Sequence, residues 1–275
     1  MKKGRIKIST VLALGILGGI LLMSVFAPLL APYDPLAVDM KNALSGPSGE
    51  HLLGTDNIGR DLLSRVIYGG RQSMVLAAVA TGLSMALGCM IGMAAGYFGG
   101  WIDTVITCIS NIFQGLPGMT MMIAIAGILG GGVASMLLAL VLTSWVGFSR
   151  LVRGEVMKIK GEYFMEGLRS LGAGHMRILF VHVLPNLVSS IVIIFATRIA
   201  SSILSVASLS FLGLGLQPPA PDWGVMISDA RMYYRSSPLL VIAPGVCIVL
   251  LSLSVNIIAD WMRDQFDVRK DSIKE

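Results

Sequence analysis

The sequence alternates between long apolar runs and short polar segments, and this alternation constrains the fold more than any other feature. One uncharged run covers residues 8–27, and another covers residues 73–97. A helix needs about 20 apolar residues to cross the hydrocarbon core of a membrane. Only 13% of the residues are charged, whereas a soluble domain carries about 25% charged residues. The pattern therefore predicts a helical chain that crosses a membrane.

We predict an all-α polytopic membrane protein with six transmembrane helices. The run 8–27 is longer than the apolar core of a signal peptide, which has about 7–15 residues, so we expect it to be a retained span. Gly115, Pro117 and Gly118 interrupt a later span. The other spans are expected at residues 104–129, 133–149, 185–212 and 238–259.

Small residues recur at every fourth position of the span 73–97. Gly88, Gly92 and Gly96 lie on one helical face, and Ala80 and Ser84 extend the stripe. Such a stripe lets two helix backbones approach closely, which is how helices associate in lipid. We therefore predict a close helix–helix contact along this face.

The basic residues predict the orientation, because cytoplasmic loops carry an excess of Lys and Arg. With the N-terminus inside, the inner segments hold fourteen basic residues and the outer segments hold six. Both termini are therefore expected in the cytoplasm. The predicted parts are a cytoplasmic tail with the first helix (1–30), an extracytoplasmic loop (31–72), a core of five helices (73–260) that includes a cytoplasmic loop (150–184), and a cytoplasmic tail (261–275).

Several chemistries have no motif to support them. The sequence contains no phosphate-binding Gly-Lys-Ser/Thr, so any use of ATP requires a partner ATPase. Cys89, Cys108 and Cys247 each lie in an apolar run without metal-ligand spacing. The net charge of +5 comes from basic residues that flank spans, which argues against nucleic-acid binding. We predict no catalytic centre, no cofactor and no metal site.

The polar loop 150–184 carries the most specific motif. Residues before Gly172 favour helix, Gly172-Ala173-Gly174 breaks it, and residues 175–183 can resume it. The loop is therefore expected to form a helix–turn–helix at the membrane surface. We expect one apolar face to dock into a groove on another protein. That face consists of Phe164, Leu168, Leu171, Ile178 and Leu179.

Glu166, Gly172 and the pair Leu184-Pro185 resemble the cytoplasmic signature of ABC importer permeases. In that signature Glu-Ala-Ala is followed by three residues, a glycine, nine residues, an apolar residue, any residue and Leu-Pro. Gly167 and Leu168 depart from the two alanines, and His182 stands where Ile or His is usual. The resemblance implies a coupling helix that docks on an ATPase subunit. The residues expected there are Glu166, Gly167, Leu168, Leu171, Gly172, His182, Leu184 and Pro185.

The resemblance covers nearly the whole chain and is closest to the second, or C-type, permease of the peptide/nickel branch. Residues 27–35, 51–61 and 210–224 resemble outer-loop motifs of that branch. It implies the type I (MetI-like) importer fold in the cytoplasmic (inner) membrane. It also implies a heterodimer with a second permease subunit, two ATPase subunits and an extracytoplasmic solute-binding protein. The expected function is ATP-driven import of di- and oligopeptides, or of nickel or metal chelates.

Arg198 is the charged residue expected in the middle of a span. A charge there is costly and normally faces a partner or water. Three roles stay open: it lines the solute path, pairs across a subunit interface, or serves as a buried structural partner. Asn111, Gln114 and Met122 are further candidates for the solute path.

The alternative function is a secondary carrier or channel that works alone. Such a protein is expected to contain an internal repeat or ionisable relays within its spans. The sequence shows no convincing repeat, and Arg198 is the single intramembrane arginine. The permease-subunit hypothesis therefore has more support.

Overall fold

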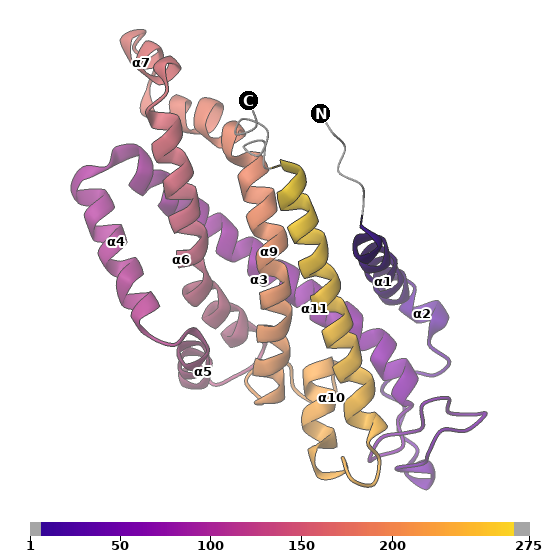
Figure 1. The fold of residues 1–275 in the computed structure, drawn as a ribbon. Helices are drawn as coiled ribbons and strands as arrows, with labels where there is room; N and C mark the ends of the chain where they lie inside the picture. The colour runs from indigo at the N-terminus through magenta and orange to yellow at the C-terminus, as the bar shows by residue number, and fades with distance from the viewer. Residues whose placement is uncertain (1–6, 267–275) are drawn as a thin grey trace.

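The computed structural model describes residues 7–266, which form a bundle of long helices with shorter helices at its ends (Figure 1). The long helices are α1 (Ile8–Val25), α3 (Leu62–Phe98), α4 (Gly100–Gly115), α6 (Val133–Lys160), α9 (Leu184–Phe211) and α11 (Leu239–Phe266). The shorter ones are α2 (Ala27–Leu30), η1 (Met40–Asn42), α5 (Gly118–Ile128), α7 (Tyr163–Ser170), α8 (His175–Arg177), the π-helix η2 (Ile178–Val183), α10 (Trp223–Asp229) and η3 (Ala230–Met232).

Five helices in the described part of the chain are long and apolar enough to cross a membrane, and α4 with α5 brings the number to as many as six. α4 and α5 meet at an angle of 92°. Leu116 between them is extended and Pro117 is not helical, because proline fixes its own φ and disfavours helix in the residue before it. The expected span 104–129 is therefore a bent pair of helices.

α3 begins at Leu62, inside the segment 31–72 that the sequence predicts as a loop. Asp61 caps this end, and its side chain accepts a hydrogen bond from the N–H of Ser64 at 2.7 Å. The first turns contain polar residues that are buried, and Arg65 is only 1% exposed. Its guanidinium donates to two distant backbone carbonyls. These contacts explain why the helix starts before the apolar run does.

α3 and α6 pack closely along the stripe of small residues. A Cβ atom on Gly88 would lie 2.6 Å from the carbonyl oxygen of Trp145, and one on Gly92 would lie 2.4 Å from that of Ser149. Distances this short leave no room for a side chain. The predicted close contact is confirmed, and it joins the two helices along their length.

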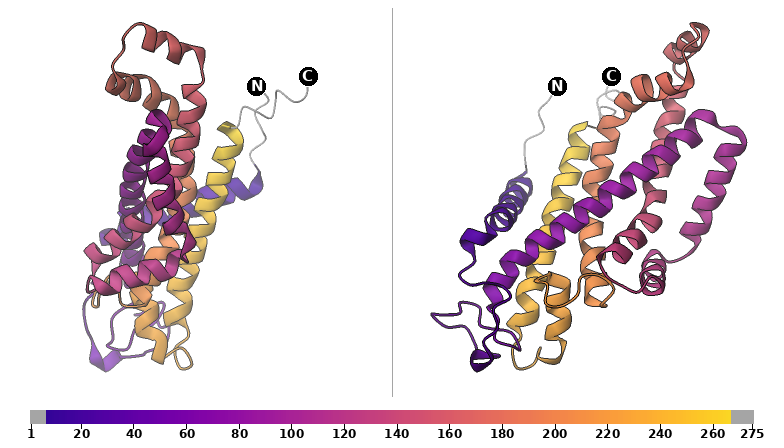
Figure 2. Two further views of the ribbon diagram at one scale, coloured as in Figure 1. Left: turned by 90° about the vertical axis from the view of Figure 1, so that its left-hand side faces the viewer. Right: turned by 180° about the vertical axis from the view of Figure 1, so that it is seen from behind.

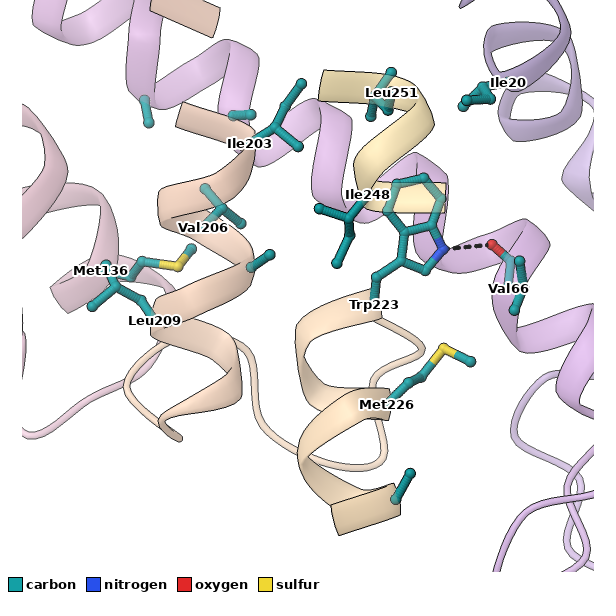
Figure 3. Close-up of a cluster of buried hydrophobic side chains, with 14 of the residues drawn as sticks. Ile20, Val66, Met136, Ile203, Val206, Leu209, Trp223, Met226, Ile248 and Leu251 are labelled. Atoms are coloured by element: carbon teal, nitrogen blue, oxygen red, sulfur yellow. Dashed lines mark hydrogen bonds between the residues drawn. The ribbon is translucent and has the colours of Figure 1, made fainter. Parts of the chain in front are cut away.

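The largest apolar cluster joins α1, α3, α6, α9, α10 and α11 (Figure 3). Trp223, at the start of α10, is fully buried in it, and its indole Nε1 donates a hydrogen bond to the carbonyl oxygen of Val66 at 2.9 Å. Val206 of α9 and Leu251 of α11 lie in the same cluster. α10 is thereby fixed against the first turns of α3.

The short helices mark two opposite ends of the bundle (Figure 1 and Figure 2). α7 lies beyond the point where α6 stops and α9 begins, and α11 finishes on the same side; we call this the α7 end. α10 and the segment 31–61 lie at the other end, which we call the α10 end. This arrangement agrees with the predicted placement of the loop 150–184 and the end of the last span on one side.

Candidate functional site

Residues 161–184, which we call the tip segment, project from the α7 end (Figure 2). α6 ends at Lys160, and α7 follows after Gly161 and Glu162. The chain then turns and returns through α8 and η2 into α9. The predicted helix–turn–helix is confirmed.

The turn of the tip segment depends on Gly172. Its φ of 73° lies in the left-handed region, which glycine adopts without strain. The N–H of Ala173 donates to the carbonyl of Leu168 at 3.0 Å, and the N–H of Gly172 donates to that of Arg169 at 2.9 Å. These two bonds form a Schellman motif, which satisfies the last carbonyls of α7. The backbone therefore requires the glycine of the signature.

The inner side of the tip segment packs into a second apolar cluster of the chain itself. Met165 and Ile178 are fully buried there, and Leu179 is nearly so. The prediction that Ile178 and Leu179 belong to a face that docks with another protein is therefore wrong. Helical spacing shows that a face is apolar, but it does not show which protein covers that face. Leu168 is half-buried at the edge of the cluster.

The outer side of the tip segment is apolar and exposed. Tyr163 is 91% exposed and Leu171 is 86% exposed, and Phe164 also reaches solvent. Glu166 is exposed beside Gly167, and its carboxylate makes no hydrogen bond or ion pair within residues 7–266. Exposed apolar side chains next to an unpaired carboxylate are typical of a surface that another protein covers.

Tyr97, near the end of α3, joins both arms of the tip segment. Its side chain is 3% exposed, and its hydroxyl shares a hydrogen bond with Nδ1 of His175 at 2.9 Å. The guanidinium carbon of Arg169 lies 5.8 Å from the ring centroid. Sequence reasoning missed this residue. The available signal was its position at the end of an apolar run, where aromatic residues gather at membrane interfaces.

The Leu184-Pro185 pair lies where the chain re-enters the bundle. η2 leads into Pro185, which has no N–H, so one carbonyl of the preceding turn loses its usual donor. The side-chain amide of Asn186 donates to the carbonyl oxygen of His182 at 2.6 Å. Leu184 packs against the second apolar cluster. This part of the signature therefore connects the tip segment to α9 and packs it against the bundle.

Arg198 of α9 lies against α6. Its side chain is exposed, and a Cβ atom placed on Gly147 would lie 2.7 Å from its Nη2 atom. The guanidinium has no hydrogen bond or ion pair with any residue between 7 and 266. The exposure of Arg198 argues against the role of a buried structural partner. The two other roles, in the solute path and at the subunit interface, stay possible.

The other candidates for the solute path lie on α4 and α5. Asn111 accepts a hydrogen bond from Arg150 of α6 at 2.6 Å. Gln114 is exposed, and Met122 packs against the largest apolar cluster. No hydrogen bond or ion pair in the described chain joins any of these residues to Arg198. The chain by itself therefore does not bring the four candidates into one polar network.

The motif 51–61 forms a buried ionic network at the α10 end. Arg60 pairs with Asp56 at 2.6 Å and approaches Asp229 of α10 at 3.7 Å. Arg65 lies 3.5 Å from Asp56. Burial raises the pKa of Asp229, while Arg60 opposes this shift. Two arginines thus balance two carboxylates and hold the outer segment against α10.

Asp222 ties α10 to α3. Its Oδ1 atom accepts hydrogen bonds from the N–H groups of Gly224 and Val225, and its Oδ2 atom accepts one from the Ser73 hydroxyl at 2.8 Å. Burial raises the pKa of the Asp222 carboxyl. Asp222 lies within the motif 210–224, but sequence reasoning assigned it no role, although it caps the first turn of α10.

Two family models match the chain. Residues 88–271 match the binding-protein-dependent transport system inner membrane component, and residues 9–47 match the N-terminal transmembrane domain of oligopeptide transport permease C. The chain is 41% identical over 249 residues to the glutathione transport system permease protein GsiD of Escherichia coli O6:K15:H31, covering 90% of this chain and 82% of the relative. The protein of the same name from Pectobacterium atrosepticum is 40% identical over 248 residues, with the same coverage.

Solved transporter structures share the fold. A chain of the MetNI methionine ABC transporter in an inward facing conformation matches with a TM-score of 0.58 at 17% identity, over 74% of this chain and 97% of that one. An amino acid ABC transporter crystallised with histidines matches with a TM-score of 0.56 at 15% identity, over 74% of this chain and 95% of that one. The predicted type I (MetI-like) permease fold is confirmed.

These matches place the chain in the inner membrane as a multi-pass permease subunit, which is not itself catalytic. Binding-protein-dependent transport of this kind implies ATPase and solute-binding partners. The chain belongs to the family of binding-protein-dependent transport system inner membrane components, and within it to the C-type permeases of the peptide/nickel ABC importers.

Proposed function

We propose that the chain is one of two permease subunits of an ATP-driven importer and that its tip segment docks on an ATPase subunit. The observation that carries this proposal is the structure of the tip segment. Met165 and the Gly172 turn fix its inner side on the bundle, while Tyr163 and Leu171 face outward. A rigid element with an exposed apolar side fits a groove on a partner.

The exposed faces of α4 and α5 support a second permease subunit. Ser110 is the buried residue of α4, and Ala126 is the buried residue of α5. α4 separates apolar from polar side chains along its length. In the assembled importer, a second permease would cover part of this surface and complete a solute path beside Arg198. The complex then contains a heterodimer of permeases, two ATPase subunits and a solute-binding protein.

We propose that the solute is a short peptide of the glutathione class. The relatives at 40–41% identity are named as glutathione permeases, and one family model is named for oligopeptide transport. Arg198 offers an exposed cation to which a peptide carboxylate would bind. Nickel or metal chelates are the other solute class of the branch.

The docking role is tested by replacing Leu171 with aspartate in the complete importer. Leu171 is 86% exposed, so the change leaves the fold intact but puts a charge into a desolvated contact. We expect the ATPase to be lost from the purified complex and uptake to stop. Leu52→Asp is the matched control, because Leu52 is 62% exposed at the α10 end, and it should retain the ATPase. Full retention of the ATPase by Leu171→Asp would refute the docking role.

The solute is tested by uptake of radiolabelled glutathione into cells that carry the complete importer. Competition by unlabelled short peptides supports the peptide class. Uptake of Ni²⁺ without any effect of glutathione would instead assign the metal class. Transport by the purified chain alone in liposomes without ATP would show that it works as a stand-alone carrier.

A further inference from the structure

α3 runs without a break from the α10 end to the α7 end (Figure 2). Its 37 residues span about 55 Å at about 1.5 Å per residue. It is tilted across the bundle, behind α9 and α11 in the view of Figure 1. A single helix therefore contacts both the tip segment and the elements at the opposite end.

At the α10 end, α3 is tied down by polar contacts. The Ser73 hydroxyl donates to Asp222 at 2.8 Å, and the Val66 carbonyl accepts from Trp223 at 2.9 Å. Arg65 also donates to two backbone carbonyls, one of them more than a hundred residues away in the sequence. Any movement of this part of α3 must displace α10 and the outer segment with it.

At the α7 end, Tyr97 is the matching attachment. Its partners His175 and Arg169 stand on the two sides of the Gly172 turn. The ring also meets Phe98 edge to face at a centroid distance of 5.1 Å. One buried side chain of α3 thus holds both arms of the tip segment.

The middle of α3 does not absorb a displacement between these two ends. Gly88 and Gly92 place its backbone in direct contact with α6, and a close-packed contact of this kind transmits strain. A shift of the tip segment, if it is held on α3, therefore reaches the α10 end.

We propose that Tyr97 is a positioning residue for energy coupling. It fixes the tip segment on α3, so that the displacement driven by the ATPase is carried along α3 to α10 and the outer segment. The proposal rests on the docking role of the tip segment stated above. Loss of Tyr97 should leave the ATPase bound and active, but more ATP should be hydrolysed for each solute imported.

Two substitutions separate the contributions of the hydroxyl and the ring. Tyr97→Phe removes the hydrogen bond to His175 and retains the contacts with Phe98 and Arg169. Tyr97→Ala removes all of them. Tyr68→Phe is the matched control, because Tyr68 lies on the same helix as Tyr97 and its hydroxyl makes no hydrogen bond within residues 7–266.

The experiment measures ATP hydrolysed per solute imported, with the complete importer in proteoliposomes and the binding protein present. We expect Tyr97→Phe to raise this ratio about two- to tenfold, the size of one lost hydrogen bond, and Tyr97→Ala to raise it further. Tyr68→Phe should match the wild type. In a double-mutant cycle, His175→Ala should add little to Tyr97→Phe, because both remove the same bond.

A merely structural role would lower the yield or melting temperature without changing the ratio. An unchanged ratio in Tyr97→Phe and in any folded Tyr97→Ala would overturn the proposal. The docking role fails in a different way, because Leu171→Asp would then retain the ATPase. If Leu171→Asp loses the ATPase while the Tyr97 variants keep the wild-type ratio, only the inference about Tyr97 is refuted.

Discussion

Replacing Gly92 with alanine should force α3 and α6 apart at their closest approach. The added Cβ atom would lie 2.4 Å from the carbonyl oxygen of Ser149 and 3.0 Å from both its Cα atom and the Cβ atom of Val152. Since favourable contacts need about 3.5 Å, the helices have to separate by about 1 Å. Overpacking of this kind costs about 1–3 kcal/mol, which exceeds the helix propensity of about 1 kcal/mol that alanine adds.

The matched control is Gly82→Ala on the same helix. A Cβ atom there meets nothing within 4 Å, so the helix propensity of alanine acts alone and should stabilise the chain. Thermal unfolding of the purified protein in detergent measures both variants. We expect a lower melting temperature for Gly92→Ala and an equal or higher one for Gly82→Ala. Equal melting temperatures for the two variants would refute the close contact between α3 and α6.

Two further predictions concern the α10 end. Trp223→Phe removes the hydrogen bond to Val66 and leaves a cavity where the larger ring was fully buried. The free energy of unfolding should therefore fall by more than the roughly 0.5–1.5 kcal/mol of the hydrogen bond alone. An unchanged melting temperature would contradict the buried position of Trp223. Burial raises the pKa of the Asp222 carboxyl, so its stabilising protonated form is lost as the pH rises from its ordinary pKa of about 4 through the raised value. Asp222→Asn keeps the Oδ1 cap and has no charge. The difference in melting temperature between this variant and the wild type should therefore shift in favour of the variant as the pH rises through this range. A difference that stays constant with pH would contradict the raised pKa.

The sequence was sufficient for five of the six expected spans within residues 7–266 and for the turn of the tip segment, but not for the 92° bend between α4 and α5. Each span is a run of about 20 apolar residues, and lipid leaves such a run few alternatives to a helix. The turn follows from Gly172, since few other residues adopt its backbone conformation. Both inferences depend on residues that are close together in the chain.

The inferences that failed depend on distant residues. α3 starts at Leu62 because Arg65, Ser73 and Val66 bind partners that lie up to 157 residues away. Likewise, the apolar spacing of Ile178 and Leu179 is the same whether the chain's own core or a partner covers them. Tyr97 was missed for the same reason, because its role depends on the position of His175 in the folded chain.

Because of the π-helix η2, the two connections of the tip segment to the bundle differ in structure. On one side α6 ends at Lys160, and the two non-helical residues Gly161 and Glu162 lead into α7. On the other side it joins α9 through a wide π-turn followed by Pro185, where fewer backbone hydrogen bonds oppose a change of angle. A segment whose two connections both allow a change of angle rotates more easily than it translates. The tip can therefore follow a change in the tilt of a docked partner while keeping its height above the bundle.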